Sequence, residues 1–98
     1  MHDMRLTEGE QTLIKHTIAS AFGNDACVWL FGSRIDDNKR GGDVDLYVES
    51  AITDTYSARL QALHALENAL PYPVDLVVNE PGRDLPVYRI ARTRGVRL

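Results

Sequence analysis

The chain has 98 residues, of which 44 % are hydrophobic and 26 % charged, and its net charge is −3 at pH 7. This length suits one domain and leaves no room for a second core. The acidic balance excludes strong attraction to nucleic acid through bulk charge, and no apolar run approaches the roughly 20 residues that a membrane span needs. We therefore expect a single domain, residues 1–98, without membrane or direct nucleic-acid binding.

The N-terminal segment and the cysteine content favour a cytoplasmic protein. Residues 1–5 contain no apolar stretch of the kind that a secretory signal requires. The single cysteine, Cys27, cannot form an internal disulfide and begins an apolar run. Such a cysteine is typical of a small core residue in a reducing compartment.

The first half of the chain predicts one helix and two strands. Thr7 and Glu10 have the spacing of a capping box, which predicts a helix over residues 8–22 that ends at Gly23. The apolar run 27–31 predicts a strand, followed by a polar connection over 33–42. A second strand is predicted over 43–49.

The second half predicts a helix, a strand, a third helix and a short edge strand. Thr53 or Asp54 can cap the helix, whose predicted apolar face comprises Tyr56, Leu60, Leu63, Leu66 and Leu70. A strand follows over 74–79. Asp84 is the predicted cap of the third helix, Gly95 its end and 96–98 the edge strand, with Val87, Ile90 and Ala91 expected to face inward.

The order of these elements indicates an α/β (α+β) fold with a small mixed sheet and packed helices. The strand at 43–49, the helix after it and the strand at 74–79 form a βαβ unit, whose crossover makes the two strands parallel. Residues that begin these strands can then meet on one face of the sheet.

Two carboxylates stand at the start of the second strand. Asp43 and Asp45 are separated by one residue, so in a strand both side chains project from the same face. Like charges this close repel, and a divalent cation such as Mg²⁺ relieves the repulsion while keeping positions open for phosphates. The plainer alternative is a strand end with two solvated aspartates, but the upstream turn Gly32-Ser33 and a third carboxylate favour the metal site.

The third carboxylate is Asp75, the single acidic residue of an otherwise apolar run over residues 72–79. A buried carboxylate without a partner is costly, so this residue needs a counter-charge. One candidate is a metal shared with the two earlier aspartates. The other is an arginine, of which the sequence offers Arg34, Arg40 and Arg89.

Together these motifs resemble the nucleotidyltransferase superfamily related to DNA polymerase β. The shared pattern is an apolar run ending in Gly-Ser, nine intervening residues, Asp-x-Asp, and a later strand with one Asp. The short chain and its Gly-Ser-Arg variant resemble the minimal nucleotidyltransferases, the antitoxins of HEPN/MNT toxin–antitoxin pairs. The resemblance covers most of the chain and implies a fold like the polymerase β palm.

The resemblance assigns roles to six residues. Gly32, Ser33 and Arg34 match the turn that binds the nucleotide phosphates. Metal binding and catalysis are assigned to Asp43, Asp45 and Asp75. Arg34 has an alternative, since it can equally pair with the acidic residues at 36 and 37. Gly42 departs from the family pattern, because many relatives carry a serine before the first aspartate.

The activity implied by this family is Mg²⁺-dependent transfer of AMP from ATP, with two metal ions. The implied acceptor is a tyrosine hydroxyl on a HEPN ribonuclease toxin, which the transfer would neutralise within a hetero-oligomer. Two alternatives stay open: an antitoxin that blocks the toxin by binding alone, and a small-molecule nucleotidyltransferase of the aminoglycoside type. The apolar residues Val87, Tyr88 and Val96 can belong either to the partner interface or to the core.

Overall fold

The computed structural model describes residues 6–31, 44–80 and 82–98. Its elements in chain order are α1 (Glu8–Phe22), β1 (Cys27–Phe31), β2 (Val44–Glu49), α2 (Thr55–Ala69), β3 (Val74–Val78), α3 (Pro86–Arg94) and β4 (Val96–Arg97). Within these ranges the strands form one sheet in the order β3-β2-β1-β4. β1 runs antiparallel to β2 and β4, whereas β2 and β3 are parallel. The predicted α+β fold with a mixed sheet is confirmed.

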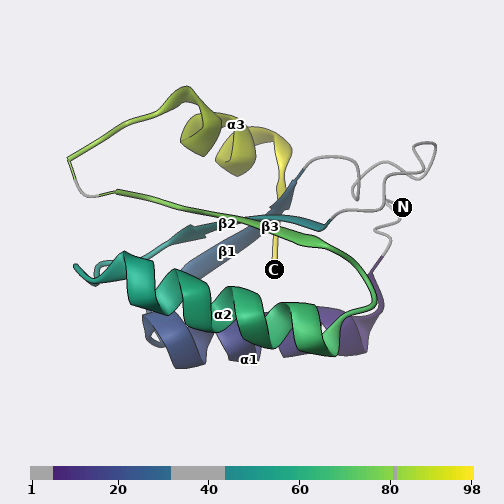
Figure 1. Ribbon diagram of the computed structural model, residues 1–98. Helices are drawn as coiled ribbons and strands as arrows, with labels where there is room; N and C mark the ends of the chain where they lie inside the picture. Colours follow the sequence, from purple (N-terminus) through teal and green to yellow (C-terminus); the bar gives the residue numbers. More distant parts are fainter. Residues whose placement is uncertain (1–5, 32–43, 81) are drawn as a thin grey trace.

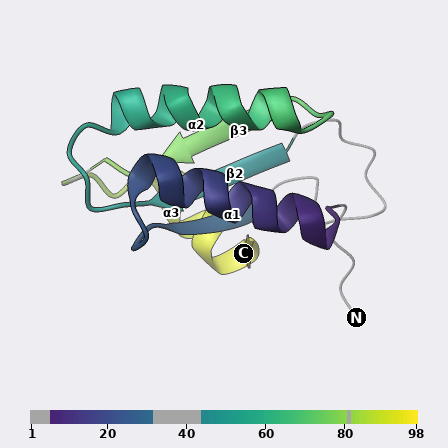
Figure 2. The same ribbon diagram turned by 90° about the horizontal axis from the view of Figure 1, so that it is seen from below.

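The sheet lies between two helices on one face and a third on the other (Figure 1). Seen from below, α1 and α2 cross the same face of the sheet side by side, and α3 lies behind it (Figure 2). The main core fills the space under α1 and α2, and its most buried side chains include Ile14, Ile18, Leu30, Leu46, Leu66 and Leu76. None of the helices in the described ranges has the length and apolar character that crossing a bilayer requires.

The first helix has the predicted bounds because both of its ends are fixed by local chemistry. The Thr7 hydroxyl accepts a hydrogen bond from the backbone N–H of Glu10, and the Glu10 carboxylate accepts one from the backbone N–H of Thr7, each at 3.0 Å. This is the predicted capping box. At the other end Gly23 has φ 101°, a conformation that favours glycine over residues with a side chain.

The predicted apolar face of α2 is wrong over its first half. Tyr56 and Leu60 are 72 % and 45 % exposed. Ala58 and Ala62 are buried instead, whereas Leu66 and Leu70 of the predicted face are buried as expected. Two alanines at this spacing let the helix backbone lie close to its neighbours, which leaves the larger side chains beside the contact. Asp54 is the N-cap, one of the two predicted residues, and its carboxylate accepts from Ser57 N–H at 3.4 Å.

The start and the inward face of α3 also differ from prediction. Leu85 is the N-cap and makes no side-chain capping bond, whereas Asp84 forms an ion pair with Arg89 at 3.8 Å. Tyr88 and Ala91 are the buried residues, and Ile90 is 48 % exposed. The helix is turned so that Tyr88 stacks on the sheet; this residue is therefore core and not a free interface.

A short edge strand follows α3, as predicted, and its position depends on Gly95. Val96 and Arg97 pair with β1 opposite Leu30 and Trp29. A Cβ atom at Gly95 would lie 2.3 Å from the Ala91 carbonyl oxygen and 2.8 Å from that of Leu30. Only glycine allows the chain to pass this close to both backbones.

Candidate active site

The register of the two parallel strands brings two of the predicted carboxylates together. Asp45 of β2 is the direct partner of Asp75 of β3. Side chains at paired positions of adjacent parallel strands project from the same face, and their strands lie about 4.8 Å apart. Asp45 is half-buried. The prediction that these two aspartates converge on one face is therefore confirmed by the backbone arrangement.

The expected burial of Asp75 is wrong. Its side chain is exposed, although its neighbours Val74 and Leu76 are buried. The reason is the two-residue alternation of the strand, which turns the valine and leucine toward the helices and the aspartate toward the opposite face. Of its suggested arginine partners, Arg89 is paired with Asp84, and Arg34 and Arg40 lie outside the described residues.

Buried neighbours fix the positions of the two carboxylates along their strands. Val44 precedes Asp45 and is fully buried, and its backbone N–H donates to the Pro73 carbonyl oxygen at 2.9 Å. Val74, the partner of Val44 in the register, is buried on the same helix-covered face. Each aspartate is thus one residue beyond an anchored valine, and a small adjustment of the backbone cannot move one carboxylate without disturbing the core.

The end of β1 meets this site from the other side. Phe31, the last residue of β1, is the antiparallel partner of Asp45. β1 therefore ends beside Asp45, one residue after the start of β2 at Val44. The predicted phosphate-binding residues Gly32, Ser33 and Arg34, and the predicted metal ligand Asp43, lie in the stretch 32–43, outside the described residues. Their assigned roles stay predictions.

An aromatic stack lies on the same face of the sheet, beneath α3. The Tyr47 ring stacks on that of Tyr88, with centroids 5.3 Å apart and planes 20° apart. The Trp29 ring is tilted against that of Tyr47, with a centroid distance of 5.6 Å. Tyr47 is fully buried, which the sequence did not indicate. The stack fixes α3 over β1 and β2, next to the carboxylates.

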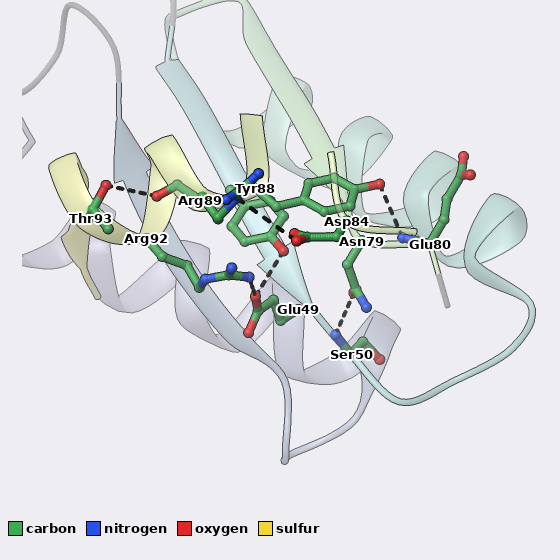
Figure 3. A network of polar contacts seen from close by, with 10 residues as sticks. Glu49, Ser50, Asn79, Glu80, Asp84, Tyr88, Arg89, Arg92 and Thr93 are labelled. Atoms are coloured by element: carbon green, nitrogen blue, oxygen red, sulfur yellow. Dashed lines mark hydrogen bonds and ion pairs between the residues drawn. The ribbon is translucent and has the colours of Figure 1, made fainter. Parts of the chain in front are cut away.

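Polar groups form hydrogen bonds with the tyrosine hydroxyls of this stack and with each other (Figure 3). The Tyr47 hydroxyl donates to the Glu49 carboxylate at 2.8 Å, and the Arg92 guanidinium donates to the same oxygen. Burial raises the pKa of the Tyr47 hydroxyl, and its hydrogen bond to Glu49 raises this pKa further. The backbone N–H of Glu80 donates to the Tyr88 hydroxyl at 3.2 Å.

This network was missed at the level of sequence. The alternation of β2 places Tyr47 and Glu49 on the same face as Asp45, and this signal was available. No pattern in the sequence indicated that Arg92, 43 residues after Glu49, would contact it.

A cleft opens beside Asp75, between β3, the start of α2 and the start of α3. Its volume is about 420 Å³, and Asp75 contributes to its wall together with Tyr56, Arg59, Glu80 and Tyr88. A second cavity, of about 530 Å³, lies between α1 and the β1–β4 edge and contains neither aspartate. We take the smaller cleft as the substrate-facing one because a candidate catalytic carboxylate lines it.

The described residues supply two ligands of the oxygen type that Mg²⁺ prefers. They contain no group of three or more histidine, cysteine, aspartate or glutamate side chains that could hold a metal. Asp45 and Asp75 nevertheless fit the way Mg²⁺ is bound in enzymes, through one or two carboxylates together with substrate phosphates and water. Asp43, the third predicted ligand, is adjacent in sequence to the described part of β2.

Comparison with known families agrees with this geometry. The family model described as "Nucleotidyltransferase domain" matches residues 13–98, which include all four strands and the stretch 32–43. No curated protein matches the chain. Members of this family generally use a nucleoside triphosphate and a divalent metal. Because the match spans most of the sequence, the chain belongs to the nucleotidyltransferase domain family, within the polymerase β-like superfamily, and is a transferase of nucleotidyl groups.

Proposed function

We propose that this nucleotidyltransferase is a Mg²⁺-dependent antitoxin that transfers AMP from ATP to a tyrosine hydroxyl of a HEPN ribonuclease toxin. The observation that carries the proposal is the pairing of Asp45 with Asp75 on the adjacent strands β2 and β3 of a small nucleotidyltransferase fold. Two carboxylates held side by side repel each other, so a protein that only occluded its partner would have no use for them.

The reaction needs positioning and charge neutralisation more than covalent help from the protein. The tyrosine oxygen attacks the α-phosphorus of ATP and the bond from that phosphorus to the bridging oxygen of the β-phosphate breaks. The products are the AMP–tyrosine ester, pyrophosphate and one proton. Asp75 is the exposed carboxylate of the pair and lines the cleft, so it is suited to accept the hydroxyl proton.

The metal ions would be held by Asp45 and Asp75, with Asp43 as the further predicted ligand. When bound, they would neutralise charge on the phosphates and stabilise the negative charge on both the attacking and the leaving oxygen. Gly32, Ser33 and Arg34 are the proposed phosphate contacts. Glycine permits close approach of the backbone, and a guanidinium adds a charge-assisted hydrogen bond to phosphate.

The acceptor is proposed to come from another molecule because the cleft beside Asp75 opens at the surface. Tyr56, which lines it, is 72 % exposed. A macromolecular hydroxyl can therefore approach Asp75 without rearrangement of the described fold. A HEPN protein is the partner that we infer from the resemblance to minimal nucleotidyltransferases.

Intact-mass measurement of the partner tests this proposal. The HEPN-domain protein that co-purifies with the chain, or is encoded beside it, is incubated with the chain, ATP and Mg²⁺. The Asp43→Asn, Asp45→Asn double variant serves as the matched control, because it keeps the side-chain shapes and removes the charges. We expect the mass of one or more AMP groups on the partner with the wild type only.

Two results would contradict the proposal. No added mass, with equally tight binding by wild type and double variant, would indicate an antitoxin that acts by occlusion. Modification of an aminoglycoside-type small molecule by the chain alone, without modification of the protein, would indicate a drug-modifying enzyme.

A further inference from the structure

The first half of α2 carries an apolar stripe that the core does not use. Tyr56 and Leu60 are one helical turn apart and lie on the same side of the helix. Both are exposed, although Ala58 and Ala62 between and after them are buried. Exposed apolar side chains that are adjacent, and next to a candidate catalytic cleft, are more informative than single ones.

The strand next to this stripe is at the edge of the sheet. In the described part of the chain, β3 pairs with β2 and with no other strand. Its bonds to β2 include those of Pro73 and Asn79 at the two ends. The N–H and C=O groups of alternate residues point to opposite sides of a strand. The groups that point away from β2 are therefore those of Val74, Leu76 and Val78. The hydrogen bond from Arg59 Nε to the Leu76 carbonyl oxygen, 2.9 Å long, confirms this direction.

The cleft follows this edge. Four consecutive residues of β3, from Asp75 to Val78, contribute to its wall, and Tyr56 and Arg59 of α2 form the side next to them. The cleft therefore follows β3 over several residues and not at a single point, and at its middle Leu76 is only 1 % exposed, with its carbonyl oxygen bonded to Arg59. An extended segment that adds to the edge of a sheet recognises this kind of surface, with main-chain hydrogen bonds for affinity and side-chain pockets for specificity.

We propose that an extended segment of the acceptor protein docks on the outer edge of β3 and presents its hydroxyl residue opposite Asp75. The identity of this partner as the acceptor rests on the proposed function. On a paired strand, the residue opposite Asp75 has its side chain on the same face, with Cβ atoms about 5 Å apart. The edge of β3 thereby sets which residue of the segment reaches the carboxylate.

The same register defines the chemistry of the segment. Its hydroxyl residue lies on the Asp75 face, and the residues on either side point to the opposite face, where Tyr56 and Leu60 of α2 present apolar surface. The segment is therefore apolar at these two positions.

Arg59 gives the free chain a way to protect this edge. By donating to Leu76, it occupies a backbone acceptor that another sheet edge could otherwise use. Charged side chains over an edge strand discourage pairing between copies. An incoming segment replaces this bond with one from its own backbone N–H.

Binding and hydrogen exchange test the docking surface directly. The probe is the co-purifying HEPN-domain protein, added without ATP to the wild type and to a Tyr56→Ser, Leu60→Ser variant. We expect slower exchange of the Leu76 and Val78 amides in the wild-type complex, and at least a tenfold higher Kd for the variant. Ile90→Ser is the matched control, because Ile90 on α3 is 48 % exposed and outside the cleft; its Kd should stay within about twofold.

The outcomes separate this inference from the proposed function. AMP transfer with unchanged Kd of the double variant and no protection of the β3 amides would overturn the docking surface and leave the enzymatic activity in place. Protection of β3 and weaker binding of the variant, without any AMP transfer, would overturn the activity and support the docking surface. A wild type that does not bind the HEPN protein would overturn both.

Discussion

The two faces of the sheet differ in almost every property, although the same strands build both. On the face under α1 and α2, Leu30, Leu46 and Val48 are fully buried among aliphatic neighbours. The face under α3 carries a carboxylate pair, an aromatic stack and an ion pair. Along β2, buried aliphatic side chains that stabilise the fold alternate with side chains that form the candidate site or make polar contacts.

This alternation separates the requirements of folding from those of the site. The free energy of folding is expected to come mainly from the aliphatic face, because burial of apolar surface is its largest favourable term. The other face can then hold like charges next to each other. Four substitutions, three of them in β2 or β3, test how complete this separation is.

The largest effect on stability is expected from Leu46→Ala, on the aliphatic face. Leu46 is fully buried, and removal of such a side chain leaves a cavity that costs about 2–5 kcal/mol. Urea denaturation measures this loss. A cost below about 1 kcal/mol would mean that the aliphatic face does not carry the stability of the domain.

The opposite behaviour is expected from Asp75→Asn. AMP transfer should fall at least roughly 100-fold, because even the loss of groups that only support metal ligands costs 10–100-fold. The free energy of unfolding should stay within about 0.5 kcal/mol, since Asp75 is exposed. Transfer rates and urea denaturation on one preparation would check both numbers. A folded variant with wild-type activity would remove Asp75 from the proposed mechanism.

A smaller effect, on stability and its pH dependence, is expected from Tyr47→Phe. The change removes the hydrogen bond to Glu49 and should cost about 1 kcal/mol at neutral pH. Because the pKa of Tyr47 is raised in the folded chain, its contribution is complete below about pH 10, where an unfolded tyrosine begins to ionise, and is lost as the pH rises further. Thermal denaturation between neutral and alkaline pH should show a shallower decline for Tyr47→Phe. Identical slopes would contradict the assigned pKa shift.

The smallest effect is expected from Arg92→Gln. Arg92 is paired with Glu49 at a partly exposed position, and such pairs are screened by salt. The loss of thermal stability should therefore be below that of Tyr47→Phe and should shrink at high salt. A large loss that does not depend on salt would show that Arg92 holds α3 by packing.

The bounds of most elements could be predicted from the sequence because local chemistry sets them. Thr7, Glu10 and Gly23 fix α1 through contacts within a few residues. The βαβ order likewise predicted that β2 and β3 are parallel, and this gave the meeting of Asp45 and Asp75. These inferences need only short-range patterns and the handedness of crossovers.

The faces of the helices could not be predicted equally well. The leucines of α2 are larger and more hydrophobic than its alanines, but the closeness of the packing placed Ala58 and Ala62 inside. For α3, Tyr88 turned inward because Tyr47 offered a ring to stack on, a contact across 41 residues of sequence. Which apolar side of a helix is buried depends on the shape of its partner, and a single sequence does not contain that shape.

The register of β2 and β3 makes the gap between the two aspartates a property of the backbone. Hydrogen bonding fixes the distance between neighbouring strands at about 4.8 Å, whatever side chains they carry. Side chains on one face of the sheet are therefore spaced by one strand separation across the strands and by two residues along each strand. A designer who wished to move this carboxylate pair into another parallel sheet would need to copy only two paired positions and the buried valine before each of them.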